Sequence, residues 1–142
     1  MFLEIRDIRK SFGSGDSRVD VLKGLDLDIE KGEFCVLLGP SGSGKSTLLN
    51  IIGGIESVDA GSISIEGEKL ADMKEKKLSQ YRRKHLGYIF QMYNLIPNLN
   101  VKENIEVGAY LSDRPLELDD LLKTLGLYEH RSKLPNQLSG GQ

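Results

Sequence analysis

The segment GPSGSGKST at residues 39–47 contains the residue types that bind a nucleoside triphosphate, at the spacing this chemistry needs. It matches the pattern G-x-x-x-x-G-K-[ST], whose fixed positions here are Gly39, Gly44, Lys45 and Ser46. A triphosphate crowds several negative charges together, so backbone N–H groups can surround it only where no Cβ intervenes. Gly42 and Gly44 permit that approach and the positive φ angles of an anion-binding turn. The segment therefore predicts a phosphate-binding loop.

Three side chains in or beside this loop have separate expected roles. Lys45 reaches the β- and γ-phosphates as a mobile charge. The Ser46 hydroxyl is placed to ligate Mg²⁺, and Thr47 starts a helix whose N-terminus faces the phosphates. The remaining loop positions are Pro40, Ser41 and Ser43. The alternative is a glycine turn that fits by chance, in a chain with 16 glycines. An apolar run before the loop and a helical pattern after it favour the binding loop.

The periodicity of the apolar residues predicts the elements that position the loop. Alternation predicts a strand over residues 2–8 and a second, antiparallel strand over 19–30. The run EFCVLL at 33–38 is apolar almost throughout, which is typical of a strand buried on both faces. Further elements are predicted as a helix over 45–55, a short strand and turn over 61–70, a helix over 75–85 and an apolar strand over 86–90.

From Asn100 onward the pattern becomes helical. Asn100 can cap one helix, and four leucines at 118–125 fall on one face of another before Gly126. We therefore expect an α/β part over 1–90 and a helical part over 91–142.

The length and composition limit the classes of protein to which this chain can belong. The chain has 142 residues, 39% of them hydrophobic, and a formal net charge of -2, so it makes at most one ordinary domain and gives no electrostatic reason to bind nucleic acid. The basic run at 81–85 is interpreted as a solvated helix face. A single cysteine, Cys35, excludes an internal disulfide; it lies in an apolar run and is expected to be buried. No apolar stretch is long enough to span a membrane, which indicates a cytosolic chain.

Three segments in order, GPSGSGKST, YIFQMYNLIPNLNVKENI and LSGGQ, resemble the ATP-binding subunits of ABC transporters. The resemblance is strongest to the branch that drives lipoprotein release, macrolide export and antimicrobial-peptide resistance. It implies an α/β P-loop ABC-ATPase core, incomplete here, with an antiparallel β subdomain and the start of a helical subdomain. It also implies an ATPase that uses ATP and Mg²⁺.

Residue roles follow from the resemblance. Phe12 matches the aromatic residue that stacks on adenine, and Val19 adds apolar contact to the base; the alternative for Phe12 is a core residue at a strand end. Gln91 matches the glutamine that contacts Mg²⁺ and the attacking water, at the end of the expected strand. Its loop, 91–99, meets the membrane permease, and we leave open which of its apolar residues form that contact.

The signature LSGGQ implies a second subunit. In the family these residues hold the γ-phosphate of the ATP carried by the partner, in a head-to-tail dimer at the inner face of the membrane. They are Leu138, Ser139, Gly140, Gly141 and Gln142.

The family's later machinery, a strand ending in Asp-Glu and a switch histidine, does not occur within the 142 residues. The expectation is that these residues belong to a longer polypeptide and that the piece alone does not hydrolyse ATP. The alternative is a non-hydrolysing nucleotide-binding fragment or regulatory module. A third hypothesis, a soluble ATPase of this class acting on DNA or ribosomes, predicts insertions or tandem domains that the sequence lacks.

Overall fold

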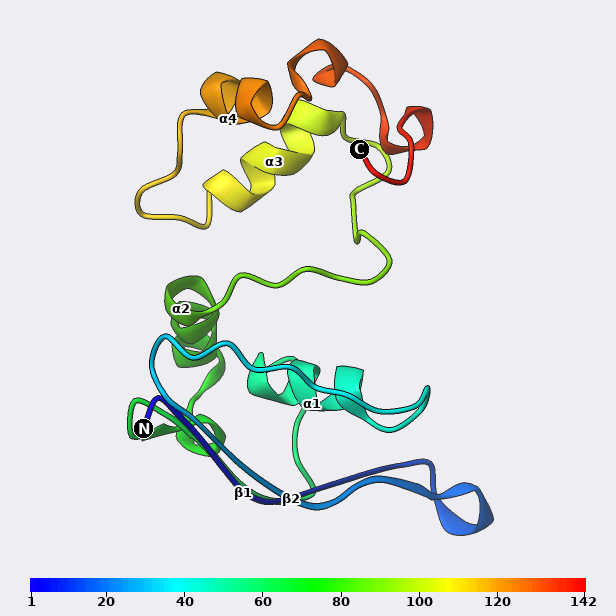
Figure 1. Cartoon of the computed structure of the whole chain (residues 1–142), viewed down its shortest axis with the longest axis vertical. Helices are drawn as coiled ribbons and strands as arrows, with labels where there is room; N and C mark the ends of the chain where they lie inside the picture. Colours follow the sequence, from blue (N-terminus) through cyan, green and yellow to red (C-terminus); the bar gives the residue numbers. More distant parts are fainter. The chain divides into compact units, whose positions relative to one another are not determined.

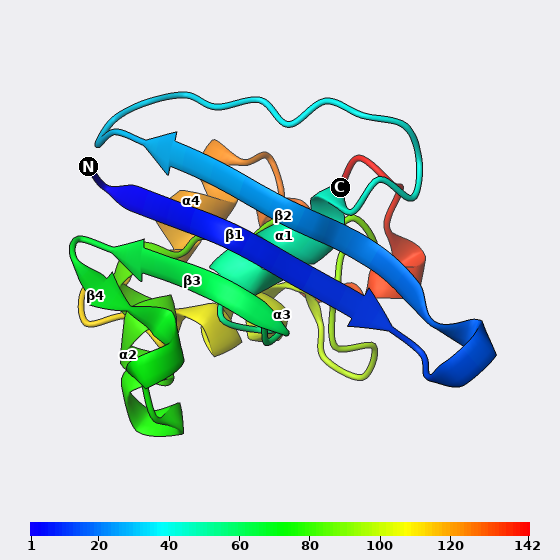
Figure 2. The same ribbon diagram turned by 90° about the horizontal axis from the view of Figure 1, so that it is seen from below.

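An antiparallel sheet supports the first of the two units into which the chain divides. The computed structural model describes all residues 1–142, with Met1–Gly87 in one unit and Tyr88–Gln142 in the other. The sheet has the order β2-β1-β3-β4 (Figure 2), with β1 at Leu3–Phe12, β2 at Val19–Ile29, β3 at Ala60–Ile65 and β4 at Glu68–Lys69. The two strands predicted near the N-terminus are thus confirmed as an antiparallel pair.

The chain has four short 3-10 turns and four α-helices, two of them in each unit (Figure 1). They are α1 at Lys45–Ile52, α2 at Glu75–His85, α3 at Val101–Ala109 and α4 at Leu118–Thr124. All four were predicted, and α3 begins at the capping residue expected for it. The Asn100 side chain accepts from the Glu103 N–H at 2.9 Å, and the Glu103 carboxylate accepts from the Asn100 N–H at 2.8 Å. None of the helices combines the length and apolar character that crossing a bilayer requires.

One extra residue in β1 sets which side chains of that strand face the core. Between Ile5 and Ile8 the strand advances three residues while its neighbour β2 advances two, from Leu27 to Leu25. The bulge falls at Asp7, which has a φ of 44° and donates its N–H to the Asp26 carboxylate at 2.8 Å. Strict alternation from Ile5 would bury Asp7. The bulge instead returns Ile8 to the core face.

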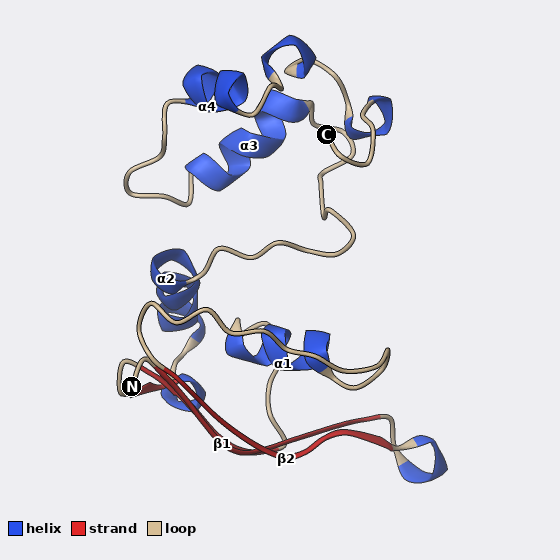
Figure 3. Ribbon diagram, viewed as in Figure 1, coloured by secondary structure: helices blue, strands red, loops and turns tan.

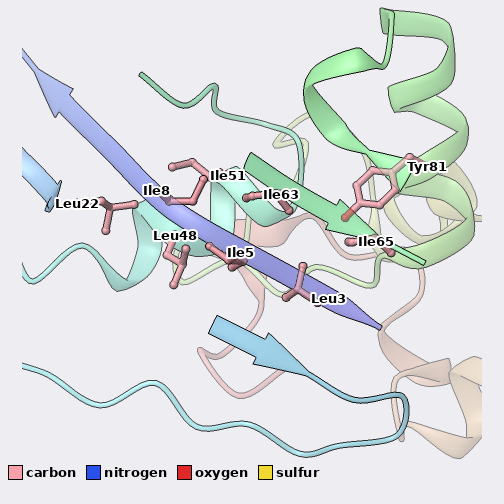
Figure 4. Close-up of a cluster of buried hydrophobic side chains, with 9 residues drawn as sticks. All are labelled: Leu3, Ile5, Ile8, Leu22, Leu48, Ile51, Ile63, Ile65 and Tyr81. Atoms are coloured by element: carbon pink, nitrogen blue, oxygen red, sulfur yellow. The ribbon is translucent and has the colours of Figure 1, made fainter. Parts of the chain in front are cut away.

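The core of the first unit lies between this sheet and α1 (Figure 4). Its buried side chains come from β1, β2, β3, α1 and α2, and they are Leu3, Ile5, Ile8, Leu22, Leu48, Ile51, Ile63, Ile65 and Tyr81. Tyr81 ties α2 to α1, because its hydroxyl donates to the Ile52 carbonyl at 2.6 Å at the end of α1. In the second unit Leu122 is fully buried, and Gly126 ends the α4 region with a φ of 68°.

Two predicted strands are wrong. Residues 33–38 and 86–90 are both loops (Figure 3), and Cys35, expected to be buried, is exposed. Phe34 and Leu38 are 91% and 87% exposed, so the apolar run carries little of the core. A strand buried on both faces needs hydrogen-bonding neighbours, and neither segment pairs with the sheet. The parallel sheet of a P-loop core is accordingly absent from these 142 residues, whose only sheet is antiparallel.

Gly61 is predicted to be essential to the bulge. Its φ is +92°, and an added Cβ would overlap the carbonyl oxygens of Arg6 and Asp7. We expect Gly61→Ala to lower the free energy of unfolding by about 2–4 kcal/mol, since both backbone strain and overlap oppose it. The matched control is Gly67→Ala, where φ is +81° but no atom lies within 4 Å. Urea titration should show a loss of only about 1 kcal/mol there; equal losses would contradict this account of the bulge.

Tyr81 is predicted to make stability depend on alkaline pH. Burial raises the pKa of Tyr81 to about 12, above the ordinary value of 10.0. The unfolded chain loses this proton first, so the contribution of Tyr81 to stability is complete below pH 10 and declines as pH rises toward 12.

The test is Tyr81→Phe. It should cost about 1–2 kcal/mol at neutral pH through the lost hydrogen bond, and it should flatten the alkaline decline measured by urea unfolding. Tyr110→Phe is the control, since Tyr110 is 86% exposed. An unchanged alkaline profile in Tyr81→Phe would show that another group causes the decline.

Candidate nucleotide-binding site

The predicted phosphate loop lies between the exposed run at 33–38 and the first turn of α1. Gly42 and Gly44 have φ angles of 79° and 89°, so the positive values predicted for both are confirmed. Gly44 directly precedes α1, and a Cβ there would lie 2.9 Å from side-chain atoms of Val21 and Leu22 on β2. The loop is therefore held close to the sheet at a position that only glycine fits.

Lys45 lies over the loop that precedes it. Its ammonium donates to the carbonyl oxygens of Gly39 at 2.8 Å and Pro40 at 2.7 Å, and contacts the Ser43 hydroxyl at 3.2 Å. These acceptors are uncharged, so phosphate oxygens can replace them with stronger, charge-assisted bonds. The first N–H groups of α1 have no partner inside the helix and face the same region. The loop thus combines a cation with several backbone donors.

A groove of about 440 Å³ separates this loop from β2. Its walls are Val19 to Leu25 on the strand and Gly42 and Ser43 on the loop. Phe12 and Val19 are direct partners at the end of the β1–β2 pair that the loop 13–18 connects, where they are 43% and 60% exposed. Phe12 is therefore not the core residue that the alternative required. Both apolar side chains are accessible at the end of the strand that lines the groove.

Gln91 lies in an exposed turn of the second unit, so the prediction that it ends a strand is wrong. The apolar residues of the loop 91–99 are mostly accessible: Met92 is 80% exposed, Tyr93 65%, Leu95 47% and Ile96 42%. The end of the loop is fixed by Asn104 on α3. Its side chain accepts from the Ile96 N–H at 2.8 Å and donates to the Leu99 carbonyl at 2.8 Å.

The signature residues form a turn that follows a 3-10 turn at Pro135–Gln137. The Ser139 N–H donates to the Gln142 side-chain oxygen at 2.9 Å, and the Gln142 N–H donates to the Ser139 carbonyl at 3.0 Å. The first of these bonds is one half of a capping box. Gly140 lies against Tyr93, whose hydroxyl would be 3.1 Å from a Cβ at that position. The Gln91 loop and the signature therefore meet within the second unit.

The predicted residues thus fall into two groups. Phe12, Val19 and residues 39–47 belong to the first unit, whereas Gln91 and residues 138–142 belong to the second. No cluster of His, Cys, Asp or Glu side chains could hold a metal by itself. Taken separately, the Ser46 hydroxyl in the first unit and the Gln91 amide oxygen in the second are each hard oxygen ligands of the type that Mg²⁺ takes beside substrate phosphates.

Sequence reasoning missed two residues that organise the site. Lys10 is buried under the end of β1, and Asn104 supports the Gln91 loop. Lys10 stands two positions before Phe12, a spacing that places both on one strand face. That spacing would have indicated that the two side chains lie together. The bulge at Asp7 interrupts the alternation, so the sequence does not show whether their face of β1 is the buried one.

The phosphate loop and the helix that it opens define a P-loop nucleotide-binding class. Comparison with known proteins narrows this class, because the family model described as ABC transporter matches residues 22–142. The chain belongs to this family.

Individual relatives agree with that assignment. The chain is 47% identical to the bacitracin export ATP-binding protein BceA of Halalkalibacterium halodurans, over 99% of this chain and 57% of that protein. It is 43% identical to the macrolide export ATP-binding/permease protein MacB of Escherichia coli K12, over 99% of this chain and 22% of that protein.

Among solved structures, the dimeric ATP-binding cassette MJ0796 bound to ADP and phosphate matches with a TM-score of 0.86 and 34% identity. That match covers 99% of this chain and 64% of the cassette, so the fold is that of the corresponding part of an ABC ATPase. The chain therefore spans less than two thirds of these relatives.

Proposed function

We propose that this chain binds Mg-ATP as part of the ATPase subunit of an ABC transporter. The observation that carries the proposal is the loop at 39–47, in which Lys45 is held over two backbone carbonyls beside the N-terminus of α1. On binding, Lys45 exchanges those carbonyls for β- and γ-phosphate oxygens. Gly42 and Gly44 let the backbone N–H groups approach the same phosphates.

The base and the metal occupy opposite ends of the nucleotide. Phe12 stacks on adenine and Val19 packs against it, since both are exposed at the end of the strand pair. Ser46 would hold Mg²⁺ through its hydroxyl at the phosphate end, and Gln91 would do so through its amide oxygen. The bound ion would supply positive charge to offset the negative charge on the phosphates. Gln91 also orients the attacking water, because an amide can accept and donate without acting as a strong base.

The proposed transporter requires two partners of this chain. A second ATP-binding subunit pairs head to tail, so that Ser139, Gly140 and Gly141 contact the γ-phosphate of the ATP carried by the partner. The loop 91–99 docks on a membrane permease, and the exposure of its apolar side chains supports this role. Such an arrangement places the subunit at the cytoplasmic face of the membrane, where hydrolysis drives transport. The similarity to BceA and MacB favours an export or peptide-resistance system.

Lys45→Ala tests the phosphate loop. We expect the substitution to weaken Mg-ATP binding by about ten- to a hundredfold, because one charge-assisted contact is lost. The urea midpoint should stay unchanged, since the bonds of Lys45 are to exposed loop atoms. Isothermal titration calorimetry measures the affinity.

The control for this variant is Lys76→Ala, which removes an exposed lysine of α2. It should bind Mg-ATP as the parent chain does. Equal affinities of Lys45→Ala and the parent chain would overturn the phosphate-loop assignment.

A further inference from the structure

Lys10 is the one charged residue buried in the first unit, with 7% of its surface exposed. Its ammonium lies 2.7 Å from the Glu56 carboxylate and 3.7 Å from that of Asp59. Both acids belong to the loop that leads from α1 to β3. A buried cation needs such partners, because an unpaired charge in an apolar environment is costly. The lysine therefore joins the end of β1 to the segment that follows the phosphate-loop helix.

The same acids hold the backbone beside Lys10. One Asp59 oxygen accepts from the Ser11 N–H at 2.7 Å and from the Ser11 hydroxyl at 2.6 Å. The Asp59 N–H donates to the Arg9 carbonyl at 2.9 Å. The hydrogen bond from Lys10 lowers the pKa of Glu56, and the hydroxyl of Ser11 lowers the pKa of Asp59, so both are ionised at neutral pH. Residues 9–11 are thus clamped directly before Phe12.

Lys10 also touches Phe12 itself. The ammonium lies over the aromatic ring, 5.2 Å from its centroid, within the range of a cation–π contact. Phe12 keeps 43% of its surface exposed, so the ring remains accessible to a second flat group. Because Glu56 and Asp59 hold the ammonium in place, its attraction to the ring face favours the orientation of the ring that keeps this contact. An exposed phenylalanine at a strand end would otherwise sample several rotamers.

We propose that Lys10 is a positioning residue for base recognition: with Glu56 and Asp59 it fixes the Phe12 ring in the orientation that stacks on adenine. The proposal rests on the assignment of Phe12 to the base in the proposed function. It separates base binding from phosphate binding, since the contacts of the Lys10 ammonium are with the Phe12 ring, Glu56 and Asp59 and not with residues 39–47. Lys10 would therefore contribute to the affinity for ATP but not to the affinity for phosphate alone.

The test compares Mg-ATP with inorganic triphosphate, which has no base. Lys10→Met keeps an unbranched side chain, one atom shorter, and removes its charge. We expect its dissociation constant for ATP to rise about three- to tenfold, while that for triphosphate stays within about twofold. Lys10→Arg, which keeps the cation, should stay within about threefold of the parent chain for both ligands. Equal weakening toward both ligands in Lys10→Met, or none toward ATP, would overturn the proposal.

Phe12→Ala separates this inference from the proposed function. If Phe12→Ala leaves ATP affinity unchanged, the base assignment fails whatever Lys10 does. If it weakens ATP binding and Lys10→Met does not, only the role of Lys10 fails. In the Phe12→Ala background, Lys10→Met should cause no further loss of ATP affinity, because it acts through the ring.

A spectroscopic measurement covers the case in which Lys10→Met is too unstable for titration. The chain contains no tryptophan, so Phe12→Trp introduces a single tryptophan beside the proposed base site, which can be excited selectively over the five tyrosines. Its anisotropy should fall when Glu56→Gln removes one charge that holds Lys10, and ATP should quench its emission where triphosphate does not. Unchanged anisotropy in Glu56→Gln, or equal quenching by the two ligands, would contradict the positioning role.

Discussion

The extra residue at Asp7 is the constraint on which the first unit depends. It keeps Leu3, Ile5 and Ile8 on one face of β1, so that this face can bury α1. The same shift brings Lys10 to the buried side and Phe12 to the end of that face. Without it, the strand would turn Arg9 and Ser11 toward the helix. Two further register shifts follow in the β1–β2 pair, between Ile8 and Arg9 and between Lys10 and Ser11. The bulge at Asp7 therefore sets which side chains of β1 face the core and which lie at the proposed base site.

The phosphate loop is supported by the elements that this core holds together. Leu48 and Ile51 anchor α1 against the sheet, and Gly44 brings the start of the helix against β2. The end of the loop at Gly44 is therefore fixed, while residues 39–43 stay exposed. Lys45 bridges the carbonyls of Gly39 and Pro40. A preorganised loop of this kind loses little entropy when it binds an anion.

Much of the fold and of the candidate site was predictable from the sequence, and the predictions that were wrong have physical causes. The pattern at 39–47 predicted the positive φ angles of Gly42 and Gly44, and local rules predicted the cap at Asn100. The runs at 33–38 and 86–90 are apolar enough for strands, but strands require neighbours, and composition does not show whether they exist. Lys10 was missed because the bulge shifts the alternation by one residue. Its closest ion pair, with Glu56, joins residues 46 positions apart, a separation that local patterns do not reveal.

Hydrogen exchange with and without Mg-ATP tests the central claim most directly. If the loop binds triphosphate through its backbone, the amides of residues 41–47 should become protected on adding the nucleotide. Amides in the middle of β1 and β3, already paired within the sheet, should exchange as before. Protection confined to other segments, with exchange at 41–47 unchanged at saturating Mg-ATP, would contradict the account.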